Sequence, residues 1–120
     1  MTKSIEQISK EFLSECHDDY VGLWSLIWSI KNEMGETNPQ NIRALTISLV
    51  TELLQQGLIE AGMPNSKGEF EGWQETPDEI IKRIEREWDQ LGREPNIGEI
   101  VWFTASERGD SDAGRKHKPS

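Results

Sequence analysis

The sequence has one cysteine and no long apolar run, and each shortage excludes a class of protein. Cys16 is the single cysteine among 120 residues, so the chain cannot form an internal disulfide. No positively charged start followed by an apolar signal-peptide segment precedes it, which predicts a cytoplasmic protein. Polar residues interrupt every apolar segment, whereas a membrane span needs roughly 18 consecutive apolar residues. We therefore expect no contact with a membrane.

Lys and Arg are scarce relative to Asp and Glu. The chain holds 13 Lys and Arg against 22 Asp and Glu, a formal net charge of -9. Residues 1–105 hold 9 against 19, a charge of -10, whereas residues 106–120 hold 4 against 3, a charge of +1. A negative surface repels the phosphates of nucleic acids and attracts basic proteins. The charge therefore predicts a basic protein as partner and makes a nucleic-acid partner the less favoured alternative.

The residue types that usually carry catalysis are few and poorly placed. Cys16 and His17 are adjacent, which on a helix directs their side chains to different faces, and His117 lies near the end of the sequence. The spacings of zinc-binding Cys and His are absent, and the glycines lack the pattern of a phosphate-binding loop. We therefore expect no enzymatic activity and no metal or other cofactor.

Apolar residues recur at helical spacing in four segments, of which two precede residue 36. Ser4 and Gln7 form the Ser-x-x-Gln pattern that is typical of a capping box at the start of a helix. For the second helix, either Asp18 or Asp19 can act as the N-cap of a broad apolar face that runs from Tyr20 to Met34. So broad a face predicts that the second helix is central in the core.

The third and fourth helices have clear start and stop signals. Asn38 is a favourable N-cap residue followed by a proline, and Gly57 fits the left-handed position after the helix. Thr76 and Glu79 form a second capping box, and Gly92 ends that segment. These signals predict helices over about residues 39–56 and 77–91.

Short apolar segments after the third helix predict strands. Residues 58–61 and 69–73 flank a loop rich in Gly and Pro, as in a hairpin, and residues 100–103 are apolar on both faces and join the hairpin. Small polar residues dominate from residue 106 onward, so residues 106–120 are expected to form a disordered tail. We predict one α+β domain over residues 1–105, mainly helical, with about four helices and an antiparallel sheet of two or three strands.

Five segments, spread between residues 23 and 103, carry a resemblance to a known family: Leu23-Trp24, LLQQGLIEAG, FEGW, TPDEIIKRIEREWDQLGR and GEIVWF. The chain resembles a family of small, acidic, uncharacterised bacterial proteins with a winged-helix-like fold. This resemblance implies a winged-helix-like domain and supplies no catalytic residues. The succession of a third helix and a hairpin is consistent with that fold.

These observations predict a non-enzymatic acidic domain that neutralises or regulates a basic protein, as immunity proteins and antitoxins do. The alternative is a winged-helix transcription regulator that dimerises through the first helix or Trp28 and presents the polar face of the third helix, Thr46 included, to base edges. We expect the tryptophans to pack in the core, with Trp28 as the exception. The candidate partner-binding residues are Trp28, Arg43, Glu52, Lys67, Glu69 and Glu71.

Overall fold

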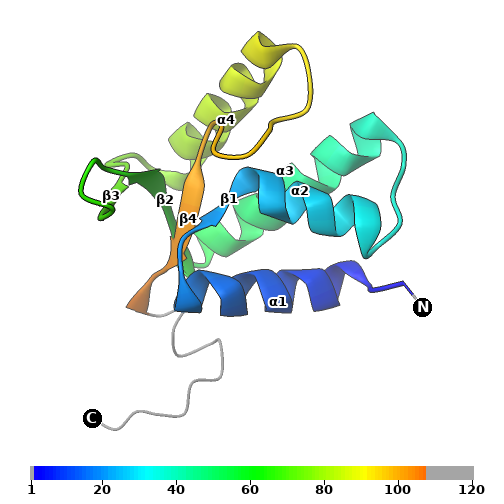
Figure 1. Ribbon diagram of the computed structural model, residues 1–120, viewed down its shortest axis with the longest axis horizontal. Helices are drawn as coiled ribbons and strands as arrows, with labels where there is room; N and C mark the ends of the chain where they lie inside the picture. Colours follow the sequence, from blue (N-terminus) through cyan, green and yellow to red (C-terminus); the bar gives the residue numbers. More distant parts are fainter. Residues whose placement is uncertain (1, 108–120) are drawn as a thin grey trace, which may run out of the picture.

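The computed structural model describes residues 2–107, which form helices around a small sheet (Figure 1). The fold is α+β and mainly helical, as predicted. In chain order the elements are α1 (Ile5–Asp18), β1 (Val21–Gly22), α2 (Leu23–Asn32), α3 (Pro39–Gln55), β2 (Ile59–Pro64), β3 (Phe70–Gly72), α4 (Pro77–Leu91) and β4 (Trp102–Ala105).

The predicted capping signals are confirmed at three helix starts. The Ser4 hydroxyl accepts from the backbone N–H of Gln7, and the Gln7 side chain accepts from the backbone N–H of Ser4. Thr76 and Glu79 form the same reciprocal pair at the start of α4. Asn38 caps α3 through its side-chain oxygen. Each cap satisfies backbone donors that a helix leaves unpaired, so local sequence alone fixes these three starts.

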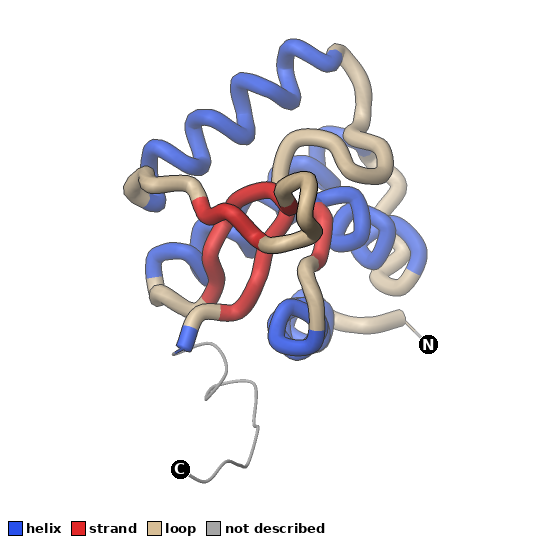
Figure 2. The backbone as a smooth tube through the Cα atoms, turned by 60° about the vertical axis from the view of Figure 1, so that its left-hand side comes forward, coloured by secondary structure: helices blue, strands red, loops and turns tan. Residues whose placement is uncertain are grey.

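The sheet has four strands in the order β1-β4-β2-β3, all paired antiparallel, rather than the predicted two or three (Figure 2). The predicted hairpin is β2 and β3, and the last strand joins it as expected. β1, which the sequence pattern did not predict, pairs with β4 through Val21 and Phe103. A strand of two residues is too short to produce a period-two signal. The likeness to a winged helix stays a prediction.

The second helix begins later than predicted, and neither aspartate caps it. α2 starts at Leu23 after Gly22, which makes no side-chain cap hydrogen bond. Asp18 is instead the last residue of α1, and Asp19 is its C-cap. The Tyr20 hydroxyl accepts a hydrogen bond from the backbone N–H of Phe70, at 3.0 Å. Contacts with the hairpin and with β4 therefore override the local capping preference of the aspartates.

The last strand also begins later than predicted, at Trp102 instead of Ile100. Ile100 has a φ of 73°, which is far from the β region and rare for a β-branched residue. The backbone N–H of Val101 donates to the carbonyl of Glu99 at 2.9 Å, so the chain makes a tight turn centred on Ile100. This turn separates the end of the α4–β4 loop from the strand.

One face of the sheet packs against α1, α2 and α3 and forms the core (Figure 1). Val21, Phe103 and Ala61 are cross-strand neighbours on β1, β4 and β2, and all three are buried. The Phe103 ring meets the Phe12 ring of α1 edge to face, with centroids 5.7 Å apart. α4 joins the same core, because Ile80, Ile84 and Trp88 are buried where it packs on α3.

The next row across the sheet faces the other way and consists of Gly22, Trp102, Gly62 and Gly72. A Cβ atom on Gly62 would lie 2.1 Å from the carbonyl oxygen of Glu71, so β2 and β3 approach too closely for any side chain there. Gly62 was expected in the loop that follows residue 61, but it lies within β2. Trp102 is the single side chain of this row.

The predicted tail lies almost entirely outside the described residues. Ser106, its first residue, donates its backbone N–H to the carbonyl of Leu58 at 3.0 Å and so continues the pairing of β4 with β2. Residues 108–120 are not described. Among residues 2–107, no helix is long and apolar enough to cross a membrane.

Candidate functional site

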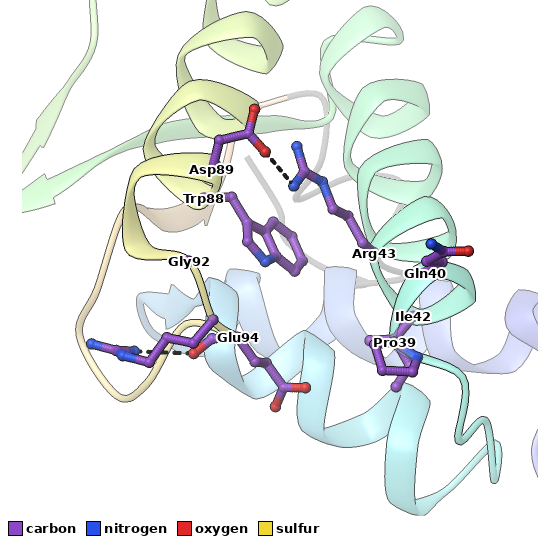
Figure 3. Close-up of a pocket in the computed structure, with 9 residues that line it drawn as sticks. Pro39, Gln40, Ile42, Arg43, Trp88, Asp89, Gly92 and Glu94 are labelled. Atoms are coloured by element: carbon purple, nitrogen blue, oxygen red, sulfur yellow. Dashed lines mark hydrogen bonds and ion pairs between the residues drawn. The ribbon is translucent and has the colours of Figure 1, made fainter.

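Arg43, the predicted reader of DNA bases, is held by the neighbouring helix α4 (Figure 3). Its Nη1 atom lies 2.7 Å from Oδ1 of Asp89, and its Nη2 atom donates to the carbonyl of Glu85 at 3.3 Å. The guanidinium carbon lies 5.2 Å from the centroid of the Trp88 ring. An arginine that already has a carboxylate, a carbonyl and an aromatic ring as partners must leave them before it can contact a base edge.

The face of α3 that would read DNA is narrower than predicted. Thr46, which we placed on that face, is fully buried and donates its hydroxyl to the carbonyl of Ile42 at 2.7 Å. The prediction was wrong because α4 packs along α3 and extends the core over this side of the helix. Asn41, Ser48 and Glu52 remain exposed.

A hollow of about 320 Å³ lies between the start of α3 and the end of α4, beside Arg43 and Trp88 (Figure 3). Its second arginine, Arg93, is also paired, because Nη1 and Nη2 each lie 2.8 Å from an oxygen of Glu99. This pairing and the backbone N–H of Asn96 lower the pKa of Glu99 to about 2. Both cations of the hollow are therefore neutralised by the protein itself.

The other predicted binding residues are scattered over separate elements. Glu52 on α3 accepts a hydrogen bond from Gln56, one turn further along the helix. Lys67, Glu69 and Glu71 lie in the β2–β3 hairpin and are exposed. Asn65 organises that hairpin, since its side chain accepts from the N–H groups of Lys67 and Glu69 and donates to Glu71 at 3.1 Å. The structure does not join these residues into one site.

Trp28 is the predicted residue that points to a surface. It is 54% exposed on α2, the most exposed of the five tryptophans. Trp88 is the one tryptophan that is buried, whereas Trp24, Trp73 and Trp102 are half-buried. The prediction of core packing therefore applies fully to Trp88 alone, and Trp28 is confirmed as exposed.

A hollow beside the outer face of the sheet has two of these tryptophans in its lining. This sheet hollow, of about 380 Å³, is lined by Tyr20, Trp24 and Trp102 together with the acidic residues Glu15, Asp18 and Asp19. The indole N–H of Trp24 is buried and has no hydrogen-bond acceptor within residues 2–107. A buried donor without an acceptor destabilises the fold, and this one lies beneath the surface instead of opening into the sheet hollow.

A second hollow, the helix hollow, continues the first along α1 and α2. It measures about 350 Å³, and Glu15 and Ser25 line both hollows. Trp28, Glu11 and Glu33 are also in its lining, and Lys3 bridges the two glutamates with its Nζ atom 2.7 Å from Glu11 and 3.1 Å from Glu33. We call the two hollows together the acidic–aromatic surface.

Glu15 stands at the junction of the two hollows. Its carboxylate makes no hydrogen bond or ion pair within the described part of the chain. Partial burial raises the pKa of Glu15, the negative charges of Glu33 and Glu11 raise it further, and Lys3 opposes them. A cation bound next to Glu15 would relieve this repulsion.

Sequence reasoning missed Glu15, Tyr20, Trp24 and Trp102 as surface residues, although one signal was present. No Lys or Arg occurs between Lys10 and Lys31, and that interval holds Glu11, Glu15 and Asp18 of α1. No feature of the sequence predicted that Trp102 lines this surface. It reaches this surface because β4 pairs with β1.

Two features of the described residues concern reactive groups: the lack of a metal-binding cluster and the burial of Cys16. Within residues 2–107, no group of three or more His, Cys, Asp or Glu could hold a metal ion. Cys16 is 1% exposed, and burial raises the pKa of its thiol, with the Glu15 carboxylate adding to the shift. The thiolate, which is the nucleophilic form, is therefore disfavoured at neutral pH.

We predict that Cys16 reacts with an aromatic disulfide reagent only when the protein unfolds. Absorbance at neutral pH should show almost no thiol in the folded protein and one thiol per chain in denaturant. Rapid modification of the folded protein would mean that α1 separates readily from the core. The substitution Ser14→Cys provides an exposed control thiol on the same helix.

With this geometry described, the chain can be compared with known proteins. No family model, no curated protein and no solved structure matches it. The resemblance to small acidic bacterial proteins therefore stays a prediction, and the function has to be inferred from the residues themselves.

Proposed function

We propose that the protein is a non-enzymatic cytoplasmic domain that binds a basic protein and neutralises or regulates it. The observation that carries the proposal is that residues 2–107 have few Lys and Arg residues and that most of them are ion-paired with the protein's own carboxylates. Residues 2–107 hold 9 Lys and Arg against 20 Asp and Glu, a formal charge of -11. Five of those cations, Lys3, Lys31, Arg43, Arg83 and Arg93, are ion-paired with the protein's own carboxylates.

The remaining cations do not form a basic face. Lys10 lies on α1, Lys67 in the hairpin loop, and Lys82 and Arg86 on α4. Phosphate contacts from several Lys and Arg supply most of the affinity of DNA-binding proteins. Four cations on three separate elements, among 20 carboxylates, would contribute little affinity for DNA. For a basic protein the same distribution is favourable, because the negative field steers it toward the surface.

Capture of partners from the native host tests this proposal. The immobilised full chain should retain a basic protein at low salt. The affinity of the purified partner should fall at least about tenfold when NaCl rises from about 50 to about 300 mM, because salt screens the electrostatic attraction. An unrelated acidic protein of similar size and charge, immobilised in the same way, is the control. Binding that is insensitive to salt, or retention equal to that of the control, would contradict the proposal.

A gel-shift assay with random double-stranded DNA tests the opposite outcome. We expect no shift at about 150 mM salt, where weak phosphate contacts are largely lost. Sequence-specific binding that Arg43→Ala abolishes would show that Arg43 leaves Asp89 to read DNA, and the proposed function would then be wrong.

A further inference from the structure

We propose that the acidic–aromatic surface over α1, α2 and β4 binds arginine side chains of a basic partner segment. The inference rests on the proposed function and adds the place and the chemistry of binding. The surface combines indole rings at Trp24, Trp28 and Trp102 with carboxylates at Glu15, Asp18 and Asp19. Within it, Lys3 is the one Lys or Arg of the described chain that lines either hollow.

The protein itself shows how an arginine binds to this combination of groups. The Arg83 guanidinium carbon lies 3.6 Å from the centroid of the Trp73 ring, and its nitrogens lie 3.1 Å from both Glu75 and Glu87. Arg43 repeats the arrangement with Trp88 and Asp89. Arg83 stacks on its indole, Arg43 lies within cation–π range of its indole, and in both places a carboxylate binds the guanidinium. The acidic–aromatic surface presents three indoles beside Glu15, whose carboxylate has no ion-pair partner among residues 2–107.

Spacing along the helices brings these groups together. Glu11, Glu15 and Asp18 are four and three residues apart on α1, so they share one face of the helix. Trp24 and Trp28 are four residues apart on α2 and also share a face. The two hollows meet at Glu15 and Ser25, so the acidic face of α1 borders the aromatic face of α2. An extended segment can therefore place one arginine in the sheet hollow and a second beside Trp28.

The bound state would also remove one unfavourable feature of the free protein. Glu15 would gain a counter-charge, whereas in the described chain it is surrounded by Glu11 and Glu33 with no cation of its own. Lys3 shows that a cation is stable here, since its Nζ atom already bridges those two neighbours.

Titration of the isotope-labelled full chain with a short blocked peptide, Gly-Arg-Gly-Arg-Gly, tests the inference by nuclear magnetic resonance. The amide signals of α1 and α2 and the indole signals of Trp24, Trp28 and Trp102 should shift together. The lysine version should bind about 2- to 5-fold more weakly, because an ammonium stacks less well on an indole. The citrulline version, which has no positive charge, should show no saturable shifts.

Two pairs of variants separate the site from general charge attraction. Glu15→Lys and Glu69→Lys change the net charge equally, but only Glu15→Lys should weaken peptide binding, by about fivefold or more. Trp28→Ala should weaken it about 2- to 5-fold with no change in charge. Ile97→Ala, at a residue that is 74% exposed, is the control for losing an exposed apolar group. Circular dichroism verifies that every variant is folded.

The outcomes distinguish failure of the site from failure of the function. Equal weakening by Glu15→Lys and Glu69→Lys, with shifts spread over the whole chain, would overturn the site and leave the proposed function standing. Absence of binding to this peptide and to every basic probe would overturn both. Sedimentation that shows a dimer which Trp28→Ala dissociates would identify the surface as a contact between two copies of the chain, which would also overturn the inference.

Discussion

Replacing Phe103 with alanine should lower the free energy of unfolding by about 4 kcal/mol, the cost expected when a large buried ring leaves a cavity. Phe103 is fully buried at the centre of the sheet, between Val21 of β1 and Ala61 of β2. Its ring also meets Phe12 of α1 edge to face. One side chain therefore joins the two ends of the described chain and the middle of its sheet, and the substitution removes all of these contacts together.

Chemical denaturation followed by tryptophan fluorescence measures this loss. Phe70→Ala is the matched control, because Phe70 lies on β3 of the same sheet and is only half-buried, with its ring centroid 5.2 Å from that of Tyr20. The control should cost about 1–2 kcal/mol, in proportion to the smaller apolar area that it buries. Equal costs for the two substitutions would mean that the core does not centre on β4.

Replacing Gly62 with alanine should lower the free energy of unfolding by about 3 kcal/mol or more, since the new methyl group overlaps the backbone. Its Cβ atom would lie 2.1 Å from the carbonyl oxygen of Glu71 and 2.8 Å from the Cα atom of Gly72. Backbone atoms of a paired strand cannot move aside without separating β2 from β3. The hairpin should therefore open locally even where the protein remains folded.

Gly72→Ala in the facing strand is the control for this prediction. The atom nearest to its added Cβ would be Oε1 of Glu60 at 3.5 Å, which is an ordinary contact. We expect a change in unfolding free energy of less than about 1 kcal/mol. Thermal unfolding and amide exchange of β2 and β3 measure both variants. A small loss of stability for Gly62→Ala together with a large loss for Gly72→Ala would contradict the observed register of the hairpin.

The internal ion pairs bear directly on the proposed role. A protein with few cations could have left them exposed as a small basic patch, but five are bound to its own carboxylates. Exposed pairs of this kind contribute little to stability, typically up to about 1 kcal/mol each. The larger consequence of these ion pairs is electrostatic. They neutralise the positive charge locally, whereas most carboxylates of residues 2–107 remain unpaired with Lys or Arg and contribute to the negative potential of the surface. The surface that results favours cationic partners over phosphates.

The sequence by itself determined the presence of four helices, the caps of three of them and the acidic balance. Ser4, Asn38 and Thr76 act within a few residues of their own positions, so the physics that sets these helix starts is present in the local sequence. Net charge is a sum over residues and needs no structure. The exposure of Trp28 also followed from the pattern, since it widens the apolar stripe of α2 beyond what the core can cover.

Only the tertiary structure decided what those elements present to a partner. β1 exists because Val21 pairs with Phe103, from the far end of the described chain, and that pairing prevents Asp18 or Asp19 from capping a helix. Arg43 is paired with Asp89 of α4, a contact that the sequence did not predict. Pairing and packing between residues far apart in the chain depend on the whole fold, and local preferences of about 1 kcal/mol yield to them. For the same reason the acidic–aromatic surface could be located only once β4 had brought Trp102 beside α2.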